Sequence, residues 1–348
     1  MRPIHDAPTG SGAVHDFTWI DGERLVRFAT GAAGEAAALA AGRGFDGYVL
    51  LTTERAASSQ PELAAAASDV AHVPLGPVPE VAAAVRDQVG GRPIVTLGGG
   101  RVIDSAKAIA GADGLRCAAV PTTLSGAEMT PFHRMPAGVD DFRFVRPALV
   151  VADPELMASQ PAPQLAASAM NALGHATEAL YTPLASPVSE LAALRAAELL
   201  ASGLTGRDEP SRDEVALGSL LAGYAVGAAG FAVHHAVCQT LVRVAGTPHA
   251  ETNAVMLPHF ARAMAPRAPR VMGALARALG ADSDDPGAAA ERIAALAAGA
   301  GATTLSELGV EREQLDELVE AALAHPAIGN TPDPIGAHEL RRLLAAAL

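Results

Sequence analysis

Hydrophobic positions in the first half of the chain alternate between short apolar runs and longer segments with helical spacing. The short runs cover residues 47–51, 94–97, 117–120 and 148–152, and their length and composition predict buried strands. Alanine-rich segments lie between them, for example over residues 80–89 and 102–110. Strands separated by helices predict a parallel sheet that is covered on both faces.

After Asp153 the pattern changes, and nearly every segment has the periodicity of a helix. The clearest examples cover residues 189–204, 271–279, 288–298, 313–324 and 338–348. We therefore predict an α/β, Rossmann-like dinucleotide-binding domain over residues 1–153. An all-helical metal and substrate domain is expected over residues 154–348, with a cleft between the two.

Composition and charge narrow the class of ligand. The 348 residues suit two domains, and the formal net charge of −13 excludes the simple electrostatic case for binding nucleic acid. Cys117 and Cys238 are too few for a disulfide framework, which favours a reducing, cytoplasmic compartment. We expect a small-molecule substrate and a homodimer.

Two segments bear on targeting. Residues 1–16 contain His5, Asp6, His15 and Asp16 and lack the apolar core of a signal peptide. Residues 217–233 carry no charge, but their many glycines and alanines favour a buried helix over a membrane span. We therefore expect no membrane partner.

A glycine triplet, Gly98-Gly99-Gly100, lies between a predicted strand and a predicted helix. Glycines allow positive φ and close approach of a ligand, and the N-terminus of the helix suits a pyrophosphate. The alternative is a tight turn without a ligand. Asp104 and Lys107 follow on the first turns of the helix. Lys107 is the only lysine among 25 basic residues, which suggests a role that a guanidinium cannot fill, unless it survives by chance.

A second polar segment follows the predicted strand over residues 117–120. Thr122 and Thr123 come directly after it, and Thr130 lies a few residues further on. Hydroxyl groups at the carboxyl end of a parallel strand lie where such sheets bind ligands. Capping of a helix is the alternative role.

A third group of polar residues lies in apolar surroundings in the helical half. Asn171 and His175 share one helix face, with Glu178 one turn further along. His235 and His249 follow later in the chain. Each histidine alone is more often structural than a ligand, but a shared site would supply enough groups for a metal, although asparagine is a weak donor.

These segments resemble a known family in sequence and in order. The matching residues are Gly98–Gly100 with Asp104 and Lys107, Pro121-Thr122-Thr123 with Glu128-Met129-Thr130-Pro131, Asp153-Pro154-Glu155-Leu156, Met170–His175 with Glu178–Tyr181, and His234-His235 to Pro248–Thr252. They resemble the iron-containing (group III) alcohol dehydrogenases and, within them, maleylacetate reductases.

The resemblance implies a dehydroquinate-synthase-like fold that binds NAD(P) at the glycine turn. It makes Asn171, His175, His235 and His249 the equivalents of the iron or zinc ligands. Asparagine at the first position is similar to maleylacetate reductases, which are generally regarded as metal-independent. Because Asn171 removes a negative charge from the site, we expect the metal to bind weakly or not at all.

Several residues depart from the family pattern. Arg101 follows the glycines in place of serine or threonine and is placed to reach a phosphate of the cofactor. Gln239 stands where a histidine is expected, and it cannot relay a proton near neutral pH. A lysine expected between Pro131 and Pro147 is absent, with Arg143 or Arg146 as a possible substitute. Near the end, Asn330-Thr331-Pro332 lacks an expected arginine.

Thr53 stands about where many relatives place an acid that selects NAD, so we expect NADP to be tolerated.

Taken with the resemblance, these residues predict an NAD(P)H-dependent reductase that transfers hydride to an activated C=C bond or carbonyl of a small oxo acid or enone. The cofactor would lie on Gly98, Gly99, Gly100, Arg101, Asp104, Lys107, Thr122, Thr123, Thr130 and Thr53. The catalytic set would be His235, His175, His249 and Gln239. Two alternatives stay open: a scaffold repurposed for a non-redox step in a specialised pathway, and a binding protein without catalysis.

Overall fold

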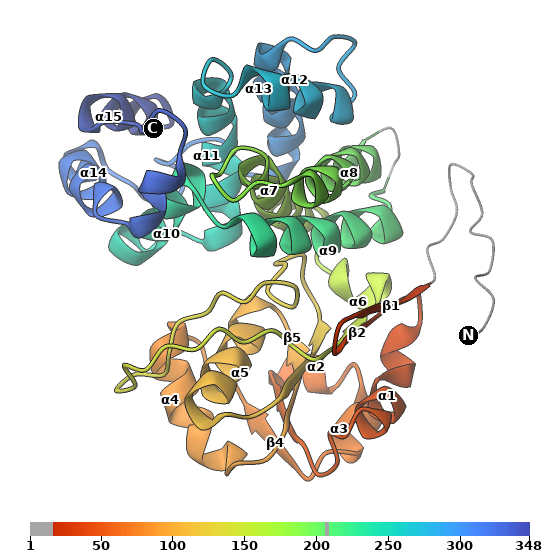
Figure 1. Ribbon diagram of the computed structural model, residues 1–348. Coiled ribbons are helices and arrows are strands. Elements are labelled where there is room, and N and C mark those ends of the chain that lie inside the picture. Colours follow the sequence, from red (N-terminus) through yellow and green to blue (C-terminus); the bar gives the residue numbers. More distant parts are fainter. Residues whose placement is uncertain (1–16, 206–208) are drawn as a thin grey trace.

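The computed structural model describes residues 17–205 and 209–348, so the N-terminal segment considered for targeting lies outside the described residues. Seven strands form one sheet, in the order β1-β2-β7-β6-β5-β3-β4 (Figure 1). Their bounds are β1 Phe17–Asp21, β2 Arg24–Phe28, β3 Val49–Thr52, β4 Asp69–His72, β5 Ile94–Gly98, β6 Cys117–Pro121 and β7 Leu149–Ala152. The four strands expected from apolar runs are β3, β5, β6 and β7, and all of them are buried.

The sheet is parallel from β2 to β4, but its edge differs from the expectation. β1 and β2 pair antiparallel, with Asp21 opposite Arg24. A two-residue turn joins them, and Gly22 adopts φ +61 there. The Asp21-Gly22 pair is a hairpin signal that the search for apolar runs missed. β4 was also missed, because this strand exposes three of its four residues and so has no apolar run.

Helices cover both faces of the sheet, as predicted (Figure 1). Successive strand residues point to opposite faces, so Leu51 packs with α4 (Val78–Val89) and α5 (Gly100–Asp113), whereas Leu50 packs with α1 (Ala36–Gly42) and α3 (Pro61–Ala65). The carboxyl ends of the parallel strands therefore share one edge, and this edge faces the helical half of the molecule.

Every described element after Asp153 is a helix. The α-helices there are α6 Pro154–Met157, α7 Ala162–Ala179, α8 Pro187–Leu204, α9 Arg212–Ala229, α10 Val233–Ala245, α11 His249–Met264, α12 Pro269–Ala278, α13 Pro286–Ala297, α14 Leu315–Leu323 and α15 Ala337–Ala346. All five helices expected from periodicity are present, within about two residues at each end. The division into two domains at Asp153 stays a prediction.

The uncharged segment over residues 217–233 belongs to two helices. Gly230, at φ +81, ends α9, and α10 begins at Val233 after a bend of 102°. Within residues 17–205 and 209–348, no single helix is long and apolar enough to cross a membrane. This bent pair alone meets those criteria when its two helices are taken together.

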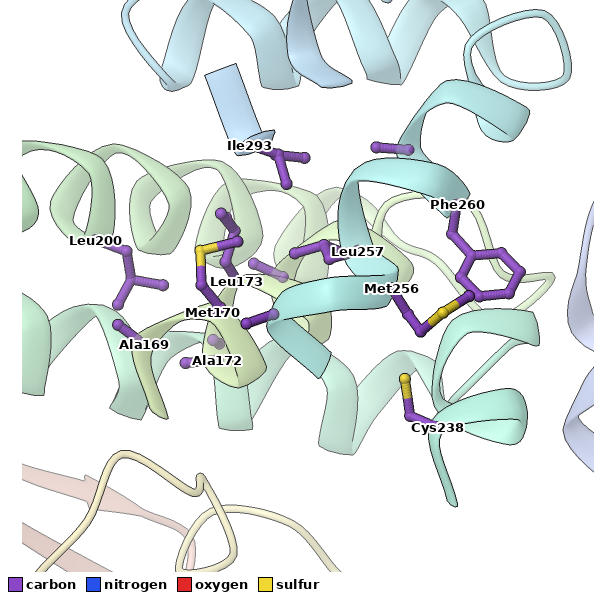
Figure 2. Packing of buried hydrophobic residues seen from close by; sticks show 14 of the residues in the cluster. Ala169, Met170, Ala172, Leu173, Leu200, Cys238, Met256, Leu257, Phe260 and Ile293 are labelled. Carbon is purple, nitrogen blue, oxygen red and sulfur yellow. The ribbon is translucent and has the colours of Figure 1, made fainter. Parts of the chain in front are cut away.

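Helix α7 lies at the centre of the helical half, and all its residues from Leu165 to Ala179 are buried. Its apolar side packs against α8, α9, α11 and α13, where Met170 and Leu173 lie among Leu200, Leu257 and Ile293 (Figure 2). The polar residues of α7 are therefore held in a rigid frame.

The two halves meet through glycines that allow close backbone contact. Gly126, in the loop after β6, lies against Gly223 of α9, and a Cβ added to Gly223 would lie 2.9 Å from both Cα and O of Gly126. Leu124 in the same loop donates its N–H to the Ser168 hydroxyl on α7 at 3.2 Å. The loop after β6 is thus fixed between the sheet and the helices.

We expect Gly223→Ala to lower the free energy of unfolding by about 1–3 kcal/mol, because the added methyl group meets backbone that cannot move aside. The control is Gly42→Ala at the end of α1, where nothing lies within 4 Å of the added Cβ. That variant should be neutral or more stable, by up to about 1 kcal/mol. Urea unfolding measures both. Equal midpoints for Gly223→Ala and the wild type would contradict the close contact.

Candidate active site

The glycine turn forms where β5 ends and α5 begins. None of the three glycines adopts positive φ, so that part of the expectation is wrong. Glycine is required here for space, because a Cβ on Gly99 would lie 2.9 Å from Thr123 Cγ2 and one on Gly100 would lie 3.1 Å from Ser125 Cβ. No side chain caps α5, so its first N–H groups are available to a ligand.

Lys107 lies about two turns further along α5 and is completely buried. Its Nζ donates to Ala127 O at 2.9 Å and to Thr130 O at 3.2 Å, and Thr130 Oγ1 lies at 3.3 Å. Asp104 Oδ1 forms an ion pair with it at 2.7 Å. A small ammonium group with three protons fits this enclosure, whereas a planar guanidinium is larger. In this structure Lys107 and Thr130 therefore fasten α5 to the loop after β6, and their role toward a cofactor stays a prediction.

Glu128 in the same loop is an unusual buried acid. Its side chain is 0% exposed, and neither carboxylate oxygen has a hydrogen-bond partner among the described residues. Arg24 lies nearby but donates to the Glu128 backbone carbonyl at 3.2 Å. Burial raises the pKa of Glu128 to about 7, although Lys107 and Arg24 oppose the shift.

The N-terminus of α10 is built on a second buried acid, Glu178 of α7. Glu178 Oε1 accepts the backbone N–H of His235 at 3.2 Å, and Oε2 lies 2.6 Å from His235 Nδ1. Thr331 Oγ1 accepts the N–H of Val233 at 3.1 Å, so side chains from two distant segments satisfy the first turn of the helix. Burial raises the pKa of Glu178, while His234 and the backbone N–H groups at the start of α10, including that of His235, act in the opposite direction.

Two buried ring nitrogens beside this pair have no hydrogen-bond partner among the described residues. They are His235 Nε2 and His175 Nδ1. The two rings are stacked, with centroids 4.5 Å apart and planes at 20°. Phe231 covers them, at 4.8 Å from His235 and 5.8 Å from His175. Because buried polar atoms are normally paired, these two unpartnered nitrogens are candidate contacts for a ligand.

His249, the first residue of α11, lies near this pair. Its Nε2 lies 3.1 Å from Asn171 Oδ1, and Asn253 donates to its backbone carbonyl at 2.7 Å. Burial among neighbouring atoms lowers the pKa of His249, and the Asp104 carboxylate opposes the shift. Asp104 lies on α5, so the helix of the glycine turn is close enough to His249 for this charge to act on it.

The predicted metal ligands do not form a metal centre in this arrangement. Within the described part of the chain, no three His, Cys, Asp or Glu side chains are placed to hold one ion. His175 and His235 stack face to face instead of directing lone pairs at one point, and Asn171 is engaged by His249. These residues do not fit a divalent metal as they stand.

Gln239 lies one turn after His235 on α10, as its spacing predicts. Its Oε1 is 3.2 Å from Nε2 of His325, a half-buried residue in the segment between α14 and α15. Sequence reasoning missed His325 and Phe231 as parts of the site, because each comes from a loop with no motif. It considered the segment of Thr331 only for its missing arginine and assigned Thr331 itself no contact.

The other predicted residues lie around the glycine turn or outside the histidine group. Arg101 is partly buried at the start of α5, and its Nε has no partner among the described residues. Thr53 caps the short helix α2 (Glu54–Ala57) beside the end of β3, and the N–H of Thr122 donates to Gly98 O at 3.1 Å. Arg143 pairs with Asp141 on an exposed loop, and Arg146 donates to Gly227 O at 2.8 Å. Neither arginine contacts the histidines.

Comparison with known proteins places these features in context. Residues 165–348 match the family model for the C-terminal region of the Fe-containing alcohol dehydrogenases. Maleylacetate reductase 1 of Rhodococcus opacus is 38% identical over 265 residues, which are 73% of this chain and 72% of that protein. The maleylacetate reductase of Sphingobium indicum is 36% identical over 321 residues, 86% of this chain and 88% of that one.

Solved structures agree in fold. An iron-containing alcohol dehydrogenase from Corynebacterium glutamicum superposes with a TM-score of 0.84 at 29% identity and covers 97% of this chain and 98% of its own. A maleylacetate reductase from Agrobacterium tumefaciens gives a TM-score of 0.81 at 28% identity, with 99% of both chains covered. The expected fold, a Rossmann-like sheet followed by helices, is confirmed.

The buried Glu128 predicts a dependence of stability on pH. The folded protein holds the proton up to about pH 7, whereas the pKa of an unperturbed glutamate carboxyl is 4.5. This contribution is fully present below pH 4.5 and is lost as the pH rises through 7, for a total of about 3 kcal/mol. In Glu128→Gln that loss should disappear, while the exposed control Glu62→Gln should follow the wild type. Urea unfolding at pH 5 and pH 8 measures the difference, and parallel curves for Glu128→Gln and the wild type would contradict it.

Proposed function

This chain belongs to the Fe-containing alcohol dehydrogenase family, and from that premise we propose that it is an NAD(P)H-dependent reductase of the maleylacetate reductase type. Its substrate is a small molecule with an activated C=C bond or a carbonyl. The observation that carries the proposal is the pair of buried, unpartnered nitrogens, His235 Nε2 and His175 Nδ1, together with a helix N-terminus that suits a pyrophosphate.

The residues at the glycine turn fit a dinucleotide. Gly99 and Gly100 let the turn pack closely on Thr123 and Ser125, and the first N–H groups of α5 have no side-chain cap. Arg101 adds a positive charge at the same helix end, and Thr53 and Thr122 lie at the ends of β3 and β6, the strands on either side of β5. A bound nicotinamide would supply the hydride. The neutral Thr53 supports use of NADP as well as NAD.

The His235–Glu178 pair is suited to deliver the accompanying proton. When the pair holds an extra proton, it is electrically neutral and carries a hydrogen on Nε2, as its burial favours. Transfer of that proton to the substrate leaves a Glu178 carboxylate hydrogen-bonded to Nδ1–H and to the N–H groups of α10. The dipole of α10 stabilises this anion. His175 and His249 border the same space and orient the substrate.

We propose that the reaction proceeds without a metal, because the donor set lacks a carboxylate and its histidines do not converge on one point. A homodimer and a cytoplasmic location stay predictions.

The purified protein should oxidise NADH or NADPH when maleylacetate or a small enone is added, in a buffer that contains EDTA. Absorbance at the nicotinamide band measures the rate, and product analysis confirms one reduced product for each cofactor oxidised. Conversion of the substrate with the cofactor unchanged would overturn the proposal in favour of a non-redox reaction. Activity that appears only after iron or zinc is added would contradict metal independence alone.

Glu178→Gln should lower kcat by about 10² to 10⁴-fold, because an amide keeps the shape but cannot exchange the proton with His235. NAD(P)H binding should be unchanged, since Glu178 lies among the histidines and not at the glycine turn. The matched control is Glu198→Gln, an exposed carboxylate on α8. Circular dichroism checks the fold. Full kcat in Glu178→Gln, or loss of cofactor binding in step with kcat, would contradict the role of the pair.

A further inference from the structure

The polar face of α10 continues outward from the catalytic histidine. His235, Gln239 and Arg243 follow at intervals of four residues, so they lie along one side of the helix. The helix rises about 6 Å between successive members of this row. A substrate that reacts at His235 and extends along α10 therefore meets Gln239 first and Arg243 next.

Hydrogen bonds fix the orientation of the Gln239 amide. The backbone N–H of Ala327 donates to His325 Nδ1 at 3.2 Å, so the proton of this neutral ring lies on Nε2. That Nε2–H donates to Gln239 Oε1 at 3.2 Å. The Gln239 oxygen is thereby occupied, and its NH₂ group is left as a donor toward the substrate. His325 is a positioning residue for this amide.

A second arginine comes from the loop after β6. Phe132 packs on Phe231 with ring centroids 4.9 Å apart, and Phe231 in turn covers His235. This contact holds the start of the loop at the site, with Arg134 two residues further along. Arg134 and Arg243 are both exposed, and neither guanidinium has a hydrogen bond or ion pair with any residue the structure describes.

The charges of these arginines converge on His325. Burial is the largest cause of the lowered pKa of His325. The positive charges of Arg134 and Arg243 lower the pKa further, and the charge of Glu178 opposes them. Two unpaired guanidinium groups near one neutral ring form a local positive field in a chain with net charge −13. Such a field attracts an anion.

We propose that Arg134, Arg243 and the amide of Gln239 bind a carboxylate of the substrate. This proposal rests on the proposed function and specifies its substrate class: an oxo acid whose recognised carboxylate is separated from the reacting carbon by several bonds. Gln239 and Arg243 lie about 6 and 12 Å along α10 from His235, which favours a carboxylate that is not directly attached to that carbon. The three side chains together replace the lysine, the histidine and the late arginine that the family pattern leads one to expect in this chain.

Binding of maleate to the full-length protein tests the site without catalysis. Isothermal calorimetry should show that the double variant Arg134→Gln, Arg243→Gln binds maleate at least about tenfold more weakly than the wild type. The reason is that the loss of even one hydrogen bond to a charged group lowers the affinity by about this factor. The control Arg342→Gln changes an exposed arginine on α15, which is not among the residues proposed to bind the carboxylate, and it should bind maleate normally. Gln239→Glu should also lose binding, because it keeps the size of Gln239 and places a negative charge where the anion would lie.

Kinetics with matched substrates provides the second readout. In the double variant, KM for maleylacetate should rise about 10- to 100-fold with kcat little changed, while the uncharged dimethyl ester should react as in the wild type. Equal maleate binding in all variants, or equal losses for acid and ester, would overturn the proposal. If no substrate oxidises NAD(P)H but maleate binding depends on the arginines, the reductase assignment fails and the carboxylate site stands.

Discussion

The buried carboxylate of Glu178 is the interaction on which the site depends. It lies on α7, the central helix of the helical half, and it accepts a backbone N–H at the start of α10 together with the contact to His235 Nδ1. One side chain thus fixes where α10 begins, how the His235 ring is turned and which of its nitrogens stays open. A charged group would be costly in this interior without those donors, so the position of the helix and the chemistry of the histidine are coupled.

Small residues bring the two halves close enough for that site to meet a cofactor. Gly99 and Gly100 allow the turn after β5 to pack on Thr123 and Ser125 in the loop after β6. Gly126 in that loop then packs on Gly223 of α9. Lys107 of α5 holds the loop after β6 by donating hydrogen bonds to the carbonyl oxygens of Ala127 and Thr130. The loop after β6 therefore belongs to both halves, and the distance between the glycine turn and the histidines is set by backbone contacts with little freedom to change.

Much of this arrangement could be predicted from the sequence. Buried strands and amphipathic helices have periodicities that are local properties, and the glycine triplet and the spacing of Asn171, His175 and Glu178 are local as well. The antiparallel β1–β2 edge was missed because one short hairpin signal competed with a strong parallel pattern. His325, Thr331 and Arg134 could not be placed, because they reach the site from loops whose paths depend on packing between segments about 90 to 190 residues apart.

By itself the sequence determined the fold class, the family and the residue types available for chemistry, since periodicity and motifs are properties of neighbouring residues. Only the tertiary structure decided what those residues do. It assigned Lys107 to fastening a loop, left His235 Nε2 open by directing Nδ1 to Glu178, and held the Gln239 oxygen on His325. The physical reason is that a hydrogen bond is made once, and which atom of a side chain stays free depends on the partner that a distant segment brings to the other atom.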